Sequence, residues 1–266
     1  MNKNILLMTA LMLAISAGAQ DWAKAKLEKS PRHQEWVKVK QGDREVHCFL
    51  VFPEVKEKAT TVVVIHENRG LTDWVRSVAD QLAEAGYIAI APDLLSGLGP
   101  NGGKTSDFSS QDAATKALYT LSPDQVTDDL KAVRAYVGKL PAANGKVVVA
   151  GFCWGGAQTF RAATNLKDIK AAFVFYGTGP ESEADYARIV CPVYGFYGDN
   201  DARVNATIPK SEELLKKAGK TYEAVKYDGA GHGFMRAGED PANTVEANKK
   251  ASVEGWKRWL GLLKKI

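Results

Sequence analysis

From Thr61 to the C-terminus, short apolar runs rich in Val, Ile and Phe alternate with longer amphipathic segments. Continuous apolar runs are typical of strands buried on both faces, and an intervening helix lets successive strands lie parallel. The predicted strands cover residues 59–66, 87–94, 146–151, 169–177, 191–199 and 221–229. The predicted helices cover residues 71–86, 122–140, 155–165, 208–219 and 241–266. This alternation predicts an α/β fold, with a mainly parallel sheet and helices on both faces.

The region before Thr61 has a different pattern. "EWVKVK" alternates apolar and polar residues, "QGD" is a turn signal, and the strand-like "REVHCFLVFP" follows. We expect a hairpin at one edge of the sheet, which brings the sheet to about eight strands. The preceding "DWAKAKLEKSPRHQ" is interpreted as a polar lead-in. Because no repeat or change of composition follows residue 20, we expect residues 20–266 to form a single domain.

The first 19 residues have the three parts of a secretory signal peptide. "MNKN" carries a lysine, "ILLMTALMLAIS" is apolar, and "AGA" is a small-residue cleavage site that ends at Ala19. The apolar part is short for a membrane span. The sequence therefore predicts export to the periplasm or the extracellular space, with no membrane association after cleavage.

Composition argues against several classes of partner and cofactor. The chain has 35 Lys and Arg against 31 Asp and Glu, spread along its length, so we expect no nucleic-acid partner. His and Cys residues are not spaced as metal ligands and there is no glycine-rich phosphate loop, so we expect no metal and no organic cofactor. The three cysteines leave at least one thiol free, and a Cys48–Cys191 disulfide stays an open alternative to two buried thiols.

The segment "GFCWGG" follows the predicted strand 146–151 and precedes a predicted helix. A strand, a glycine-flanked turn and a helix form the nucleophile elbow of hydrolases, here with Cys153 where serine is commoner. The helix N-terminus favours a thiolate at this position over a thiol. We predict that Cys153 is a nucleophile; the alternative is a structural cysteine in a tight turn.

Candidate partners for Cys153 follow later strands, whose carboxyl ends share one edge of the sheet. His232 lies between glycines after the last predicted strand and suits a general base. Asp199 and Asp201 follow the strand before it, and spacing does not choose which of them orients the histidine. The order nucleophile, acid, histidine is that of α/β hydrolases.

Two further features point to the same edge of the sheet. Glu67 in "IHENRGL" comes too early to cap the helix over 71–86, for which Thr72 or Asp73 fits better, so it is a candidate functional carboxylate. Residues 95–120 are rich in Gly and Ser and too long for an ordinary connection. They are either a lid or site-lining segment or a plain surface loop.

Five segments taken together resemble the dienelactone hydrolase (carboxymethylenebutenolidase) family of the α/β-hydrolase fold. They are "HENRGL", "APDLLSG", "GKVVVAGFCWGG", "YGDNDARV" and "GAGHGFMR", and the resemblance runs from about Trp36 to the C-terminus. It implies Cys153 as nucleophile, His232 as base and Asp201 as the acid of the triad. It also implies a carboxylic ester hydrolase that acts on small esters or lactones through an acyl-enzyme.

The resemblance assigns auxiliary roles as well. It implies that Glu67 interacts with the cysteine when substrate is absent, and that the backbone amides of Asn68 and Trp154 form the oxyanion hole. Arg236 would bind a substrate carboxylate. A second arginine that such enzymes carry shortly after "PDL" is missing here, and Arg69 or Arg76 could take its place.

The sequence leaves several alternatives open. The chain could be a non-catalytic binding protein on a hydrolase scaffold, or an esterase or peptidase of larger substrates. A thiol-exchange protein would need a resolving cysteine near Cys153, and the sequence has none. We expect a monomer or a small homo-oligomer with a small-molecule ester or lactone substrate.

Overall fold

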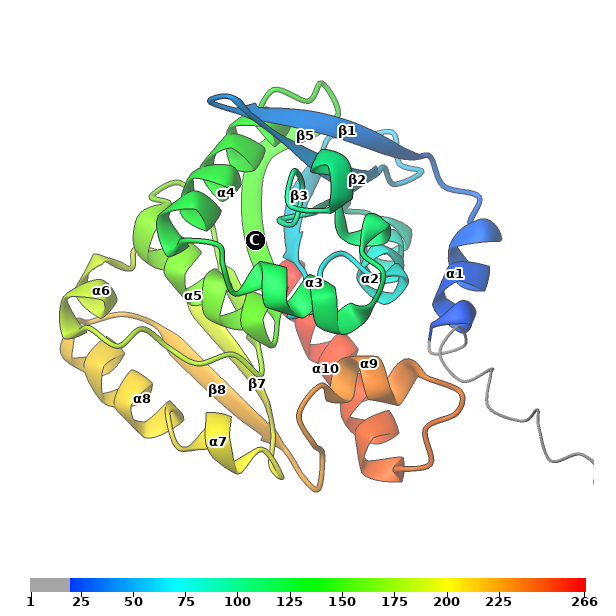
Figure 1. Cartoon of the computed structure of the whole chain (residues 1–266). Coiled ribbons are helices and arrows are strands. Elements are labelled where there is room, and N and C mark those ends of the chain that lie inside the picture. Colours follow the sequence, from blue (N-terminus) through cyan, green and yellow to red (C-terminus); the bar gives the residue numbers. More distant parts are fainter. Residues whose placement is uncertain (1–19) are drawn as a thin grey trace, which may run out of the picture.

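The structure is a computed structural model and describes residues 20–266; the predicted signal peptide lies outside the described residues. One eight-stranded sheet runs through it in the order β1-β2-β4-β3-β5-β6-β7-β8 (Figure 1). The first two strands form an antiparallel hairpin and β2 joins β4 antiparallel, whereas the pairs from β4 to β8 are parallel. The predicted α/β class, the edge hairpin and the mainly parallel sheet of eight strands are confirmed.

The strand bounds agree with the apolar runs, apart from the extra residues at the start of β5. They are β1 Gln34–Gln41, β2 Arg44–Val51, β3 Ala59–Ile65, β4 Ile88–Pro92, β5 Ala143–Phe152, β6 Ala172–Phe175, β7 Val193–Gly198 and β8 Tyr222–Tyr227. The helices are α1 Asp21–Glu28, α2 Asp73–Glu84, α3 Gln111–Leu118, α4 Pro123–Val137, α5 Trp154–Asn165, α6 Glu183–Arg188, α7 Ala202–Asn205, α8 Ile208–Lys217, α9 Phe234–Glu239 and α10 Glu246–Leu263.

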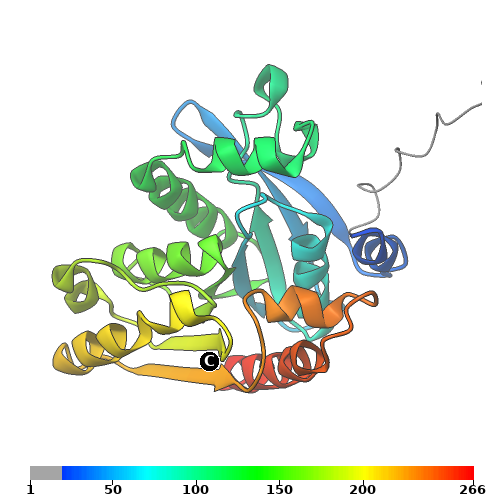
Figure 2. The same cartoon turned by 60° about the horizontal axis from the view of Figure 1, so that its bottom comes forward.

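Two helical layers cover the two faces of the sheet (Figures 1 and 2). Within β3, Val63 and Ile65 belong to a core shared with α4, α5, α6 and α8, whereas Val62 and Val64 belong to a core shared with α1, α2, α9 and α10. Successive side chains of a strand point to opposite faces, so an unbroken apolar strand supplies both cores at once. The carboxyl ends of the parallel strands stay free for polar loops.

The segment interpreted as a polar lead-in begins with a helix, α1, which is not predicted from the sequence. Its buried residues, Ala23 and Leu27, pack in the same core as α2. The sequence pattern does not reveal this helix, because only two apolar residues of a polar segment are buried and they give little helical periodicity. Helix α2 starts at Asp73 with Thr72 in the N-cap position, as predicted.

The Cys48–Cys191 alternative is wrong, since both thiols are free and buried. Cys48 is on β2 and Cys191 precedes β7, and β4, β3, β5 and β6 lie between these two strands. Neighbouring strands are about 4.8 Å apart, so the two Cα atoms lie far beyond the 7 Å or so that a disulfide spans. Burial raises the pKa of the Cys191 thiol to about 11, which makes it a poor nucleophile at neutral pH.

Residues 20–266 contain neither a helix that could span a membrane nor a cluster of metal-ligating side chains. No helix in this part of the chain is both long and apolar enough to cross a membrane. The same residues contain no group of three His, Cys, Asp or Glu side chains arranged to hold a metal ion.

Candidate active site

Cys153 occupies a strained turn between β5 and α5. Its φ is 56° and its ψ is −116°, a left-handed conformation that costs free energy in a residue other than glycine. Glycines make the turn fit: a Cβ on Gly151 would collide with the carbonyl group of Gly155, and one on Gly155 would collide with the carbonyl oxygen of His66. The turn therefore presents the thiol of Cys153 at the carboxyl end of the central strand, as the elbow motif predicts.

Three side chains from three separate loops form a continuous hydrogen-bonded row. His232 Nε2 lies 3.1 Å from Cys153 Sγ, and His232 Nδ1 lies 2.5 Å from Asp201 Oδ2. Asp201 is buried, whereas Asp199 is exposed and lies 3.8 Å from Lys226. The structure thus brings Asp201, and not Asp199, to the histidine.

The environment of His232 favours the imidazolium form. Its hydrogen bond with Cys153, together with the one it donates to Asp201, raises the histidine pKa to about 9 despite partial burial. Below that pH the ring is protonated, so at neutral pH a positive charge faces the sulfur atom. Tyr176, also in a left-handed conformation, packs edge-on against the ring with centroids 5.1 Å apart. The ring is therefore held by a hydrogen bond on each side and by an aromatic contact.

The two amides expected to form the oxyanion hole have no acceptor. The backbone N–H groups of Asn68 and Trp154 donate to no atom in residues 20–266, whereas Cys153 N–H donates to Phe175 O. Trp154 is the first residue of α5, and the first N–H groups of a helix have no intrahelical partner. Both N–H groups are therefore available to an external oxygen.

The expected contact between Glu67 and the cysteine is absent, and this prediction is corrected. Glu67 Oε2 accepts a hydrogen bond from Arg236 Nε at 2.8 Å, while Cys153 bonds to His232. Glu67 is 6% exposed, so its carboxylate requires a charged partner, and Arg236 in α9 supplies it. This pair occupies the Nε of the arginine that was expected to bind a substrate carboxylate.

His66 is a residue that the sequence reasoning missed. Its ring is fully buried, with Nδ1 2.7 Å from Glu67 O and Nε2 3.2 Å from Leu94 N. Since a carbonyl only accepts and an amide N–H only donates, the ring must be the neutral tautomer protonated at Nδ1. Burial lowers its pKa, which keeps it neutral, and the ring stacks on Trp154 with centroids 5.6 Å apart. His66 therefore contacts both segments that carry the free amides.

This arrangement gives a testable expectation for His66→Leu. The substitution leaves Glu67 O and Leu94 N–H unpaired and frees the loop that carries Asn68. We expect kcat for p-nitrophenyl acetate to fall about 10- to 100-fold with KM within about threefold, a smaller loss than outright removal of an oxyanion donor. His66→Asn, whose amide can still donate to Glu67 O, should recover part of kcat. A kcat within about twofold of wild type in His66→Leu would contradict a positioning role.

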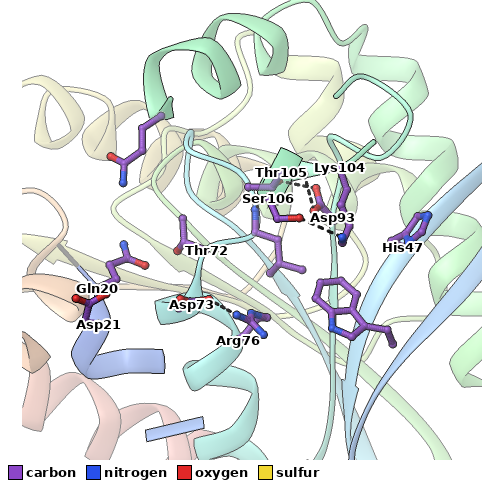
Figure 3. Close-up of a pocket in the computed structure, with 13 residues that line it drawn as sticks. Gln20, Asp21, His47, Thr72, Asp73, Arg76, Asp93, Lys104, Thr105 and Ser106 are labelled. Carbon is purple, nitrogen blue, oxygen red and sulfur yellow. Dashed lines mark hydrogen bonds and ion pairs between the residues drawn. The ribbon is translucent and has the colours of Figure 1, made fainter. Parts of the chain in front are cut away.

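Arg69 and Arg76 lie along two adjoining recesses outside the row of Cys153, His232 and Asp201. A recess of about 620 Å³ includes Arg76, and a second of about 560 Å³ includes Arg69. Thr72, Thr105 and Gln111 line both recesses, which together are here called the polar groove. Figure 3 shows the residues that line the larger recess. Residues 95–120, which include α3, supply part of the wall of the groove; of the two earlier alternatives, the structure favours a lining segment over a plain loop.

Solved structures with this architecture define the class. The chain superimposes with a TM-score of 0.75 on a structure titled as a putative dienelactone hydrolase from Klebsiella pneumoniae, at 24% identity over 88% of this chain and 99% of the other. An esterase from Pyrobaculum calidifontis superimposes with a TM-score of 0.65, at 17% identity over 93% of this chain and 91% of the other. The fold is that of the α/β hydrolases.

Relatives identified by sequence define the family within this fold. A protein of Methylorubrum extorquens named "Putative carboxymethylenebutenolidase" is 30% identical over 84% of this chain and 77% of its own length. One of the same name from Salmonella typhimurium is 31% identical over 83% of this chain and 82% of its own length. Residues 46–266 match the Dienelactone hydrolase family. The chain belongs to this family and is a carboxylic ester hydrolase.

Proposed function

We propose that the chain hydrolyses small esters or lactones by two-step acyl transfer, with Cys153 as nucleophile, His232 as acid–base and Asp201 as its orienting carboxylate. The observation that carries the proposal is the unbroken row from Cys153 Sγ through His232 to Asp201, with contacts of 3.1 and 2.5 Å. A nucleophile, a base in hydrogen-bond reach and a third group that orients the base define this chemistry irrespective of fold.

In the first step the sulfur of Cys153 attacks the substrate carbonyl carbon and the carbonyl electrons move to oxygen. The free N–H groups of Asn68 and Trp154 donate to that oxyanion. Its collapse breaks the C–O bond to the leaving group, which takes a proton from His232 Nε2. An acyl-thioester remains on Cys153, and in a lactone the released alcohol stays attached to it.

In the second step a water molecule gives a proton to His232 and attacks the thioester carbonyl. The same amides hold the second oxyanion, and its collapse releases a carboxylic acid and the sulfur of Cys153, with His232 again protonated. Asp201 keeps Nδ1 protonated throughout, so that Nε2 is the atom that exchanges protons. Glu67 and Arg236 lie beside this machinery, where an anionic substrate could exchange for Glu67 as the partner of the arginine.

The test is a screen of purified protein against short-chain p-nitrophenyl esters and five- and six-membered lactones, each with and without a free carboxylate. We expect saturable turnover of at least the acetyl ester at neutral pH. A carboxylate-bearing substrate that is preferred over its methyl ester would support an anion-binding role for Arg236. Turnover that does not exceed the uncatalysed rate for every ester and lactone would overturn the proposal in favour of a non-catalytic binding protein.

A further inference from the structure

The polar groove holds an aromatic side chain open to solvent. Trp36 on β1 lines the larger recess and is 44% exposed, although indole rings are usually largely buried. Its ring packs edge-on against Phe49 at 5.6 Å, which fixes its orientation on the sheet. Lys104 and Arg76 approach the ring centroid to 5.4 and 5.9 Å. An immobilised, half-open indole in a recess of this size is typical of small-molecule sites.

Charged side chains of both signs line the groove: Asp21, Asp73, Asp93 and Asp112 against Arg69, Arg76 and Lys104. Arg76 pairs with Asp73, and Lys104 Nζ donates to Ser106 Oγ at 3.1 Å. Asp93 accepts hydrogen bonds from the backbone N–H and the hydroxyl of Thr105 at 3.0 and 2.7 Å. Figure 3 shows these groups around the recess, with Gln20 and Asp21 on the opposite side from Lys104. The groove therefore has one more carboxylate than cation and presents no patch of a single sign.

The lining also contains His47, the apolar Leu71, Phe108 and Ala114, and seven side chains with hydroxyl or amide groups. Across both recesses these seven are Gln20, Thr72, Thr105, Ser106, Ser109, Ser110 and Gln111. Groups of this kind donate and accept hydrogen bonds but carry no charge. Together with one flat aromatic surface they match an uncharged ligand that has many hydroxyl groups and an apolar ring face, which describes a sugar ring.

The smaller recess is lined by residues that adjoin Asn68 and Trp154, the residues of the proposed oxyanion hole. Arg69, which lines that recess, directly follows Asn68, so their Cα atoms are about 3.8 Å apart. On the other wall Phe108 and Ala114 belong to the same apolar cluster as Trp154. The smaller recess is therefore lined by the chain neighbour of Asn68 and by two residues from the apolar cluster of Trp154.

We propose that the polar groove binds a saccharide, with one sugar ring against Trp36, and that the substrates are acylated saccharides whose sugar part occupies the groove. The saccharide-binding site is inferred from the groove alone, whereas the substrate class also depends on the proposed function. The acyl carbonyl of such a substrate would lie toward Asn68 and Trp154 while the sugar extends along Thr72, Thr105 and Gln111.

Calorimetric titration with xylotriose, cellotriose and maltotriose tests the site without turnover. We expect at least one of them to bind with a dissociation constant in the millimolar range or tighter, and Trp36→Ala to weaken it about tenfold or more, which is a loss of about 1.4 kcal/mol. Trp36→Phe, which keeps an aromatic surface, should lose less. Tyr119→Ala is the matched control, since Tyr119 is 64% exposed and lines neither recess.

Kinetics then test the substrate class. For acetylated xylotriose, Trp36→Ala should raise KM about tenfold, while kcat and KM for p-nitrophenyl acetate stay at wild-type values. If p-nitrophenyl acetate is hydrolysed but none of the three trisaccharides binds at millimolar concentration, the saccharide site is wrong and the proposed function stands. If a trisaccharide binds but no ester is turned over, the proposed function fails and the site stands. Equal losses of affinity in Trp36→Ala and Tyr119→Ala would also overturn the assignment of the groove.

Discussion

Cys153→Ala should lower kcat for p-nitrophenyl acetate by about 10⁴-fold or more, since removal of a catalytic nucleophile disables the whole unit of nucleophile, base and acid. The variant should still fold, because alanine fits the space of a cysteine and the strained turn is set by Gly151 and Gly155. Steady-state kinetics and thermal unfolding measure the two effects separately. Wild-type protein quenched during turnover should gain the mass of the acyl group on Cys153, and the variant should not.

Cys191→Ala is the matched control for this experiment. Cys191 is a free thiol that is 5% exposed and lies before β7, away from the row that contains Cys153. Loss of the Cys191 thiol should create a small core cavity and lower the free energy of unfolding by about 1 kcal/mol, while kcat stays unchanged. If Cys153→Ala kept more than a tenth of wild-type kcat, or if Cys191→Ala lost as much activity, the nucleophile would have to be sought elsewhere.

The sheet could be predicted from the sequence because its signal is local. An unbroken apolar run such as residues 59–65 serves two cores, and its partners follow from the alternation with helices. Helices α1 and α9 gave no such signal, since each buries only two residues and owes its stability to contacts with distant segments. A predicted helix start agrees best where the sequence shows a capping residue, as at Thr72 before α2.

The site was predictable to the extent that each residue had its own motif. Cys153 and His232 lie between glycines after strands, and the topology brings those strand ends together. The pairing of Glu67 with Arg236 joins residues 169 positions apart and depends on how α9 packs, which no local pattern contains. His66 was read only as the end of a strand, because its role depends on Leu94 and Trp154. The polar groove likewise combines β1, α2 and residues 104–114, and only the fold assembles it.

Asp201→Asn should lower kcat by about 10²-fold or more, whereas Asp199→Asn should leave kcat within about twofold of wild type. The carboxylate of Asp201 accepts the Nδ1 proton of His232 and stabilises the imidazolium, and an amide in its place can donate to Nδ1 and select the wrong tautomer. The second oxygen of Asp201 accepts from Val204 N at the start of α7, and the amide oxygen of asparagine can keep that cap. The loss should therefore be electrostatic and not structural.

The pH profile separates this role from a general loss of stability. Asp201 contributes to raising the pKa of His232 to about 9, so its neutralisation should move that pKa downward and the imidazolium should lose its proton at lower pH. The alkaline limb of kcat/KM should shift to lower pH in Asp201→Asn and stay in place in Asp199→Asn. Asp199 lies 3.8 Å from Lys226 at the surface, where a pair of this kind contributes little. A larger loss in Asp199→Asn, or an unshifted profile in Asp201→Asn, would remove Asp201 from the mechanism.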